Sequence, residues 1–382
     1  MIGLNQRGTI RSITQIQNMV RRMLVLFLFA ATISACKKTT RAPETPVDPV
    51  PETAYFPPLT GTEWQSITPG SLGWNETLLN DLYTYLESKN TVSFIILKNG
   101  KIVAEKYFGT TNRETLRYWA SAGKTVTALL VGIAQQEGLL SINDRSAQYL
   151  GAGWTSAPSV KENLITIRHQ LTMTTGLDET AADTDCTDPA CLQYKSDAGT
   201  RWFYHNAPYT MLDKVIEAAS GKSFNAYFQE KIRDRIGMNG LWNKIGYNNV
   251  YFSNARSMAR YGLLLLNKGK WDQTAILNDP AYLDAMLNSS QNLNASYGYL
   301  TWLNGKVTHM LPTTSFVFPG MLFPNAPADL YAALGKNDQK LYVVPSQKLV
   351  VVRMGESAGN VQLAASSFDN ELWGKLKPII GY

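Results

Sequence analysis

Runs of β-forming residues lie near both ends of the folded part of this chain, and a long helical stretch separates them. Residues 92–97 and 102–108 flank an Asn-Gly pair, which is typical of a tight β-hairpin. Residues 341–344 and 349–353 form a second pair of runs, joined by a turn that contains proline. Residues from about 144 to 285 are mainly helical and loop-rich. The sequence therefore predicts an α/β (α+β) fold whose sheet comes from both ends of the chain, with a mainly helical inserted domain.

Apolar residues at helical spacing predict the individual helices. The expected helices cover residues 75–89, 125–136, 208–219, 224–236 and 368–380. Asn75 is suited to cap the first of them, and a glycine closely follows each of the middle three, as is common at helix C-termini.

Residues 1–35 have the features of a secretory signal peptide. Arg21 and Arg22 precede a short apolar run, which is followed by Ile-Ser-Ala and then Cys36. The run is much shorter than the ~20 residues of a membrane-spanning helix. The residues before Cys36 match a bacterial lipobox, which predicts lipidation of Cys36; ordinary cleavage beside an incidental cysteine is the alternative. We expect an exported lipoprotein of the bacterial cell envelope, periplasmic or associated with the outer membrane.

The segment after the lipobox is rich in proline and predicts a tether. Residues 36–60 form this lipid-anchored linker, and residues 61–382 form the folded domain. The formal net charge is +6, and residues 1–35 contribute four arginines and no acid, so the rest of the chain carries only +2. A chain so close to neutral gives no electrostatic support for nucleic-acid binding, and the expected membrane contact is through the lipid anchor. The oligomeric state is left open.

Two further cysteines, Cys186 and Cys191, lie five residues apart. An oxidising compartment favours a local disulfide between them. A metal site is the alternative, but Cys-x4-Cys lacks a second ligand pair nearby, and the chain contains no His-Glu-x-x-His. We therefore expect no metal and no cofactor.

Ser121 and Lys124 lie at the predicted start of helix 125–136. Residues three apart on a helix share a face, so the lysine amine can reach the serine hydroxyl. A serine hydroxyl needs a base to become nucleophilic, and a lysine can serve when burial lowers its pKa. A helix cap followed by a solvated lysine is the alternative, although an exposed lysine is less expected beside so apolar a helix.

A second candidate motif is Tyr204-His205-Asn206, just before the helix at residue 208. Asn206 could cap that helix. In the functional interpretation, Tyr204 relays a proton to the leaving group and Asn206 orients Lys124 or the substrate. His205 could line a cleft beside Tyr204 or simply pack. On this motif alone the alternatives stay open.

Together, Ser121-x-x-Lys124 and Tyr204-x-Asn206 resemble the motifs of the serine β-lactamase and penicillin-binding-protein superfamily. The likeness is greatest to its class C-like branch, which includes esterases and 6-aminohexanoate-dimer hydrolase-type enzymes as well as β-lactamases. It covers roughly residues 75–382. Further similar segments are residues 165–177, 255–262, 297–299 and 343–352.

The resemblance implies an antiparallel sheet flanked by helices, with an additional helical domain. It also implies an exported serine hydrolase that acts through an acyl-enzyme on an ester, amide or related acyl substrate, either a small molecule or a peptide. Ser121 would be the nucleophile, Lys124 its base and Tyr204 an acid or base, and Asn206 would position groups. The alternative is a catalytically silent sensor or cell-wall-binding module that resembles a penicillin-binding protein.

The chain departs from the family at its third motif, which is commonly Lys-Thr-Gly or His-x-Gly. No Lys-Thr-Gly is present, and the nearest equivalent is Ala332-Ala333-Leu334-Gly335-Lys336. A backbone N–H of Leu334 or Gly335 would complete an oxyanion hole with that of Ser121. Lys336 could receive a substrate carboxylate, with an exposed turn lysine as the alternative. The departure weighs against β-lactamase activity and not against hydrolysis.

Two other interpretations concern the histidines and the aromatic residues. A Ser-His-Asp hydrolase would need one of only three histidines near its nucleophile, and the chain has no Gly-x-Ser-x-Gly. Trp119, Trp202, Tyr204 and Trp302 lie in or near the motifs and could form an aromatic cleft wall, or else belong to the core.

Overall fold

The computed structural model describes residues 53–180, 183–360 and 363–382. The predicted signal peptide, Cys36 and the first part of the predicted tether lie outside these residues. Residues Thr53–Tyr382 form one unit of the chain. Within its described part, every helix is too short or too polar to cross a lipid bilayer.

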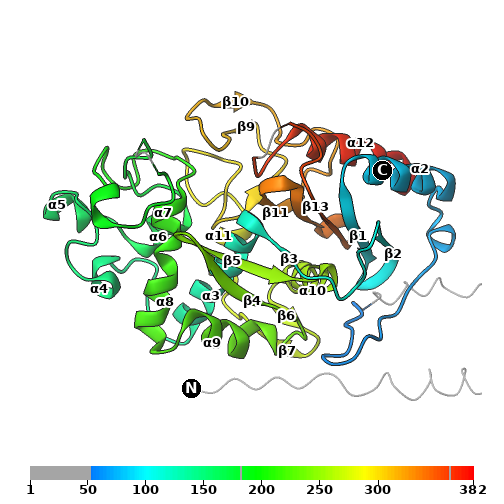
Figure 1. Cartoon of the computed structure of the whole chain (residues 1–382), viewed down its shortest axis with the longest axis horizontal. Helices are drawn as coiled ribbons and strands as arrows, with labels where there is room; N and C mark the ends of the chain where they lie inside the picture. The colour runs from blue at the N-terminus through cyan, green and yellow to red at the C-terminus, as the bar shows by residue number, and fades with distance from the viewer. Residues whose placement is uncertain (1–52, 181–182, 361–362) are drawn as a thin grey trace, which may run out of the picture. The chain divides into compact units, whose positions relative to one another are not determined.

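A six-stranded antiparallel sheet joins the two ends of the chain and confirms the predicted fold (Figure 1). Its order is β2-β1-β13-β12-β11-β8, so the N-terminal and C-terminal hairpins meet where β1 pairs with β13. The strands are β1 (Thr91–Lys98), β2 (Lys101–Tyr107), β8 (Trp302–Leu303), β11 (Tyr331–Gly335), β12 (Gln339–Val344) and β13 (Leu349–Gly355).

The turn between β1 and β2 requires its Asn-Gly sequence. Asn99 and Gly100 both have positive φ, at 49° and 85°, as a two-residue hairpin turn of this kind demands. A Cβ at Gly100 would lie 1.8 Å from the Tyr55 carbonyl oxygen. The Tyr55 N–H in turn donates to the Asn99 carbonyl at 3.0 Å. Residues 53–60, which the sequence assigned to the tether, thus contact the folded domain.

Helices cover both faces of the sheet. On one face lie α2 (Glu76–Ser88) and α12 (Ser367–Ile380), where the Tyr342 ring meets Trp373 of α12 edge-on at 5.6 Å. On the other face lies α10 (Ala255–Leu266), where Gly262 sits against Leu341 and Val350. Leu341 and Tyr342 are neighbours in β12, so their side chains point to opposite faces of the sheet. Since Leu341 contacts α10 and Tyr342 contacts α12, these two helices lie on opposite faces. As predicted, the side chain of Asn75 caps α2.

Helix α3 (Lys124–Gln136) is the central helix of the site. Its side chains are buried on every side from Lys124 to Ala134, as expected of a helix that is apolar all round. It ends near Gly138, whose φ is 70°. The helix therefore carries its first residue, Lys124, into the interior.

The inserted region is less helical than predicted. Besides α10, its α-helices are α4 (Ala147–Leu150), α5 (Ser159–Glu162), α6 (Ile167–Leu171), α7 (Asn206–Thr210), α8 (Leu212–Ser220), α9 (Phe224–Phe228) and α11 (Pro280–Leu287). The expected helix 208–219 is divided at Met211, and the expected helix 224–236 continues as a π-helix, Gln229–Arg233.

The region also contributes two strands to a sheet that was not predicted, and the third strand comes from the segment just before Ser121. The sheet has the order β3-β5-β4, with β3 (Arg117–Tyr118), β4 (Leu241–Ile245) and β5 (Asn248–Ser253). Polar residues interrupt these strands, and Leu241 and Ile245 are exposed, so apolar alternation does not mark them. Two smaller hairpins pair β6 (Lys270–Trp271) with β7 (Thr274–Ala275) and β9 (Thr308–His309) with β10 (Phe318–Pro319).

Candidate active site

Ser121 lies in a short 3₁₀ turn, Ala120–Gly123, between β3 and the start of α3. Ala120 has a φ of 48°, in the left-handed region that a residue with a Cβ rarely adopts. Trp119 holds the preceding backbone in place, because its N–H donates to the Tyr251 carbonyl at 2.8 Å and its indole N–H donates to Ser253 at 2.7 Å. The strand β5 therefore fixes the turn that presents Ser121.

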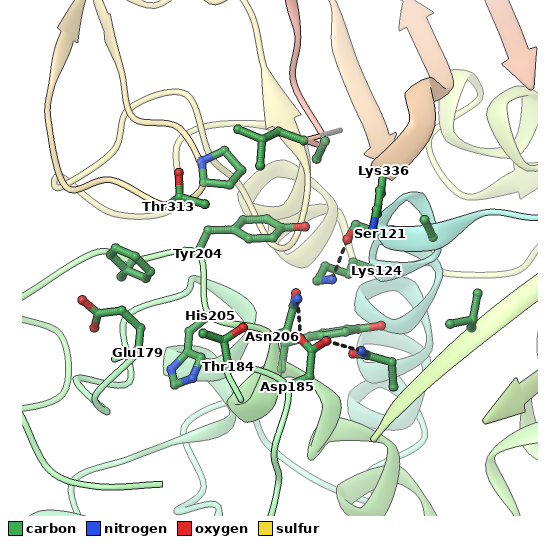
Figure 2. A pocket seen from close by; sticks show the side chains of 18 of the residues that line it. Ser121, Lys124, Glu179, Thr184, Asp185, Tyr204, His205, Asn206, Thr313 and Lys336 are labelled. Carbon is green, nitrogen blue, oxygen red and sulfur yellow. Dashed lines mark hydrogen bonds between the residues drawn. The ribbon is translucent and has the colours of Figure 1, made fainter. Parts of the chain in front are cut away.

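Lys124 reaches Ser121 as the helical spacing predicts. Its Nζ donates to the Ser121 Oγ at 2.9 Å (Figure 2). The Lys124 side chain is buried, and this burial lowers its pKa to about 7, against the opposing charges of Asp185 and Asp213. The alternative of a solvated lysine is therefore wrong. A substantial fraction of Lys124 is neutral near pH 7, in the form that can accept a proton.

Tyr204 approaches Ser121 from the opposite side of the cleft. Figure 2 shows its hydroxyl directed toward Ser121. Burial raises the pKa of Tyr204 above its usual value, while Ser121 opposes that shift. The ring stacks on Trp302 at 5.7 Å between centroids. Tyr204 is thus a protonated phenol at neutral pH, held by its ring.

The three tryptophans near the motifs belong to the core. Trp119, Trp202 and Trp302 are each no more than 2% exposed. None of them lines the cavity beside Ser121, whereas Tyr204 does. The aromatic-wall interpretation is therefore wrong for the tryptophans, and Trp302 contacts the site by stacking on Tyr204.

Asn206 is the first residue of α7 and does not cap it. The N-cap position belongs to His205, and no side-chain cap bond is made. The Asn206 Nδ2 instead donates to the Asp185 Oδ1 at 2.8 Å, while the Asn206 Oδ1 is buried and accepts no hydrogen bond from any described residue. Its amide is therefore oriented by a charged neighbour.

These groups open onto one cavity of about 880 Å³. Ser121, Lys124, Tyr204 and Asn206 line it, together with His205 and Lys336. His205 does line the cleft, but burial lowers its pKa to about 4, so the ring is uncharged at neutral pH. Among the described contacts of Ser121 none involves a histidine, which leaves the Ser-His-Asp alternative without support.

The strand expected to supply an oxyanion donor, β11, passes directly beside Ser121. A Cβ at Gly335 would lie 2.3 Å from the Trp119 carbonyl oxygen and 3.1 Å from the Ala122 nitrogen. Leu334 is fully buried. Among Leu334, Gly335 and Lys336, only Lys336 lines the cavity. Figure 2 shows Lys336 next to Ser121.

Cys186 and Cys191 are joined as a disulfide, with an S–S distance of 2.10 Å. The structure therefore has these sulfur atoms bonded to one another and not arranged around a metal. Across residues 53–180, 183–360 and 363–382, no group of three or more His, Cys, Asp or Glu side chains could hold a metal ion.

Three residues that surround the site were not predicted from the sequence. Asp185 contacts Asn206, the Tyr209 ring lies 4.2 Å from the Lys124 Nζ, and Asp213 is buried with its pKa raised to about 7. Asn206, Tyr209 and Asp213 follow one another at spacings of three and four residues. That spacing places them on one face of the α7–α8 segment. It is the sequence signal from which Tyr209 and Asp213 could have been predicted.

A change of Lys124 to methionine should reveal the lowered pKa in the free energy of unfolding. Between its folded pKa of about 7 and its ordinary value of 10.5, the unfolded chain binds the proton that folded Lys124 has lost. Wild-type stability should therefore rise with pH relative to Lys124→Met, by up to about 1.4 kcal/mol per pH unit. Urea unfolding of both proteins at pH 7, 8 and 9 measures this difference, and a difference independent of pH would contradict the lowered pKa.

Comparison with known proteins identifies the family and the fold of the chain. The sequence matches the family model named Beta-lactamase over residues 84–371. No functionally curated protein matches the chain. Solved structures do resemble it, at identities low enough that the likeness concerns the fold.

One similar structure is a penicillin-binding-protein homologue from Caulobacter crescentus, with 13% identity, a TM-score of 0.63, and coverage of 82% of this chain and 99% of that one. Another is a Bacillus anthracis protein assigned as a 6-aminohexanoate-dimer hydrolase, with 18% identity, a TM-score of 0.62, and coverage of 83% and 89%. A third is EstCE1, a hydrolase with promiscuous acyltransferase activity, with 13% identity, a TM-score of 0.59, and coverage of 81% and 99%.

The match to the family model spans most of the sequence and includes both candidate motifs. The fold is shared with hydrolases and with penicillin-binding-protein homologues. This chain therefore belongs to the beta-lactamase family.

Proposed function

We propose that this protein is a serine hydrolase that forms an acyl-enzyme at Ser121. The observation that carries the proposal is the 2.9 Å contact between the Ser121 Oγ and the Nζ of Lys124, a buried lysine with a pKa of about 7. A lysine with this pKa combines a useful neutral fraction with enough basicity to accept a proton at neutral pH. Membership of the beta-lactamase family and hydrolases among the similar structures support it.

In the first half-reaction, neutral Lys124 accepts the Ser121 hydroxyl proton as the Oγ attacks the substrate carbonyl carbon. The carbonyl π bond breaks, and its electron pair becomes the oxyanion of a tetrahedral intermediate. When that intermediate collapses, the bond to the leaving group breaks. The leaving oxygen or nitrogen receives a proton from the Tyr204 phenol, and the Lys124 ammonium restores the proton to Tyr204. The products are an ester of Ser121 and the free alcohol or amine.

In the second half-reaction, water attacks the Ser121 ester and gives up a proton to the same groups. The acid product leaves, and the Ser121 Oγ recovers its proton. Tyr204 suits the role of acid because its raised pKa keeps the phenol protonated at neutral pH. Lys124 is then the base that starts each half-reaction.

We assign the oxyanion hole to the backbone N–H groups of Ser121 and Lys336. The sequence predicted Leu334 or Gly335 as the second donor. Gly335 lies against the Trp119 carbonyl, and Lys336 is the residue of this strand end that lines the cavity beside Ser121. The donor is therefore expected one residue beyond the predicted pair.

The substrate class that the site supports is an ester or amide with an acyl group that fits a cavity of about 880 Å³. A cavity of this volume admits a small molecule or a short peptide. The missing Lys-Thr-Gly makes a β-lactam the less favoured member of the class. We also propose that the enzyme works outside the cytoplasm on a lipid anchor at Cys36, a location in which the Cys186–Cys191 disulfide would persist.

A fluorophosphonate probe tests the activated serine directly. Intact mass of the wild-type protein should show one adduct, and Ser121→Ala protein treated in the same way should show none. Turnover of an ester, amide and β-lactam panel then ranks the substrates. A well-folded wild type with neither an adduct nor turnover would overturn the proposal and support the sensor or binding alternative.

A further inference from the structure

The Asp185 carboxylate binds two amide side chains from different parts of the chain. Its Oδ1 accepts a hydrogen bond from Asn206 Nδ2 at 2.8 Å (Figure 2). Its Oδ2 accepts one from Asn248 Nδ2, also at 2.8 Å. Asn206 begins α7 and Asn248 begins β5. The carboxylate therefore ties the loop before Cys186 to both elements at the cavity wall, which Asp185 itself lines.

The loop that carries Asp185 is held on both sides of this residue. The Asp185 N–H donates to the Asp183 Oδ1 at 2.9 Å. The next residue, Cys186, is buried and bonded to Cys191. Farther along the loop, Asp188 accepts a hydrogen bond from the Tyr247 hydroxyl at 2.7 Å. The disulfide therefore closes a small loop immediately beside the residue that contacts Asn206.

A carboxylate partner decides which way the Asn206 amide faces. Ionised Asp185 can only accept hydrogen bonds, so the donating NH₂ end of the amide must face it. The oxygen end then points away from Asp185. In the view of Figure 2, the Asn206 amide lies between Asp185 and Lys124. Its Oδ1 is buried with no donor among the described residues, so it is free to accept one from Lys124 or from a bound substrate.

We propose that Asp185, held by the Cys186–Cys191 loop, is a positioning residue that keeps the Asn206 oxygen directed into the active site. The inference rests on the proposed hydrolase function and adds to it. It gives the disulfide a role in the reaction, since the cross-link holds Asp185 in place. A loop without the cross-link would sample positions from which the carboxylate no longer reaches Asn206.

The charge of Asp185 also acts on Lys124. It opposes the lowering of the Lys124 pKa by burial. The other ionisable groups near the Lys124 amine come from α7, α8 and the segment before α7: Tyr209, Asp213 and Tyr204. Lys336, just after β11, lines the same cavity. Removal of the Asp185 charge alone should therefore lower the Lys124 pKa further, and the pH at which the enzyme gains activity should fall.

The main experiment compares Asp185→Asn with Asp188→Asn. Both changes remove one negative charge from the same loop and preserve side-chain shape, but Asp188 contacts Tyr247 and not Asn206. We expect kcat/KM of Asp185→Asn to fall by roughly tenfold or more, because one of the two amides loses a charged acceptor. The acid limb of its pH profile should move to lower pH. Asp188→Asn should keep the wild-type rate and profile, because the amide oxygen of asparagine still accepts the hydrogen bond from Tyr247 and so keeps the loop in place.

Each rate is divided by the concentration of active sites, which is measured by complete labelling of Ser121 with the fluorophosphonate. A preparation with a smaller folded fraction is then not mistaken for a slower enzyme. Cys186→Ser/Cys191→Ser protein should show a loss of kcat/KM in the same direction, and so should wild type treated with a reductant. If the wild type is active and Asp185→Asn has the same activity and pH profile, the role of Asp185 is overturned while the proposed function stands. An inactive wild type overturns the proposed function itself.

Discussion

Ser121→Ala should reduce the turnover of any acyl substrate by at least about 10³-fold, because no acyl-enzyme can form without the Oγ. The fold should persist, since the change removes a single oxygen from a turn that Trp119 holds through its own backbone and indole bonds. Residual activity would come only from substrate binding and the oxyanion donors. Steady-state kinetics on the best substrate of the ester and amide panel, with circular dichroism of both proteins, measures the effect.

Ser315→Ala is a suitable control for this change. Ser315 lines the same cavity but is exposed, and no hydrogen bond joins it to a lysine of the described residues, so its hydroxyl lacks the base that Ser121 has. Turnover by Ser315→Ala should stay close to wild type. Undiminished hydrolysis by folded Ser121→Ala protein would refute the mechanism, whatever the control shows.

Lys124→Met should lower kcat by about 10² to 10⁴-fold, the range that a general base supplies. Methionine is apolar and of similar length, so it fills the buried site without a group that accepts a proton. In the wild type, activity should rise with pH through about 7, as Lys124 loses its proton. The variant should lose this acid limb together with most of its rate.

Lys124→Arg separates the loss of the base from the loss of the charge. Arginine stays protonated throughout the accessible pH range, so it should be as inactive as methionine while it keeps the positive charge beside Tyr204 and Tyr209. A variant at position 124 that retained both its rate and the limb near pH 7 would show that another group deprotonates Ser121. Probe labelling rates across pH report the same step without dependence on a substrate.

The features that the sequence predicted correctly depend on local geometry. The Asn99-Gly100 turn needs two positive φ values, so it marks the first hairpin without reference to the rest of the fold. The contact between Ser121 and Lys124 follows from helical spacing, and the apolar character of α3 predicts that the lysine is buried. Recognition of the family then supplied the antiparallel sheet, which the structure confirms.

The features that it missed depend on contacts between distant segments. Asp185 meets Asn206 across a separation of 21 residues and Asn248 across 63, and neither spacing leaves a periodic signal. The β4–β5 hairpin is rich in polar residues because one of its strands is largely exposed. The position of Lys336 beside Ser121 depends on how closely β11 approaches the nucleophile turn. Only the packed chain specifies that approach.

That approach has a consequence for how the enzyme could diversify. At Gly335 the backbone of β11 touches the turn that carries Ser121, and any larger residue would push the strand and the nucleophile apart. Position 335 is therefore closed to substitution. Position 336, one residue later, is exposed and projects into the cavity, so its side chain can change while the catalytic spacing is preserved. A lineage that adapts to new acyl substrates would be expected to vary at 336 and to keep glycine at 335.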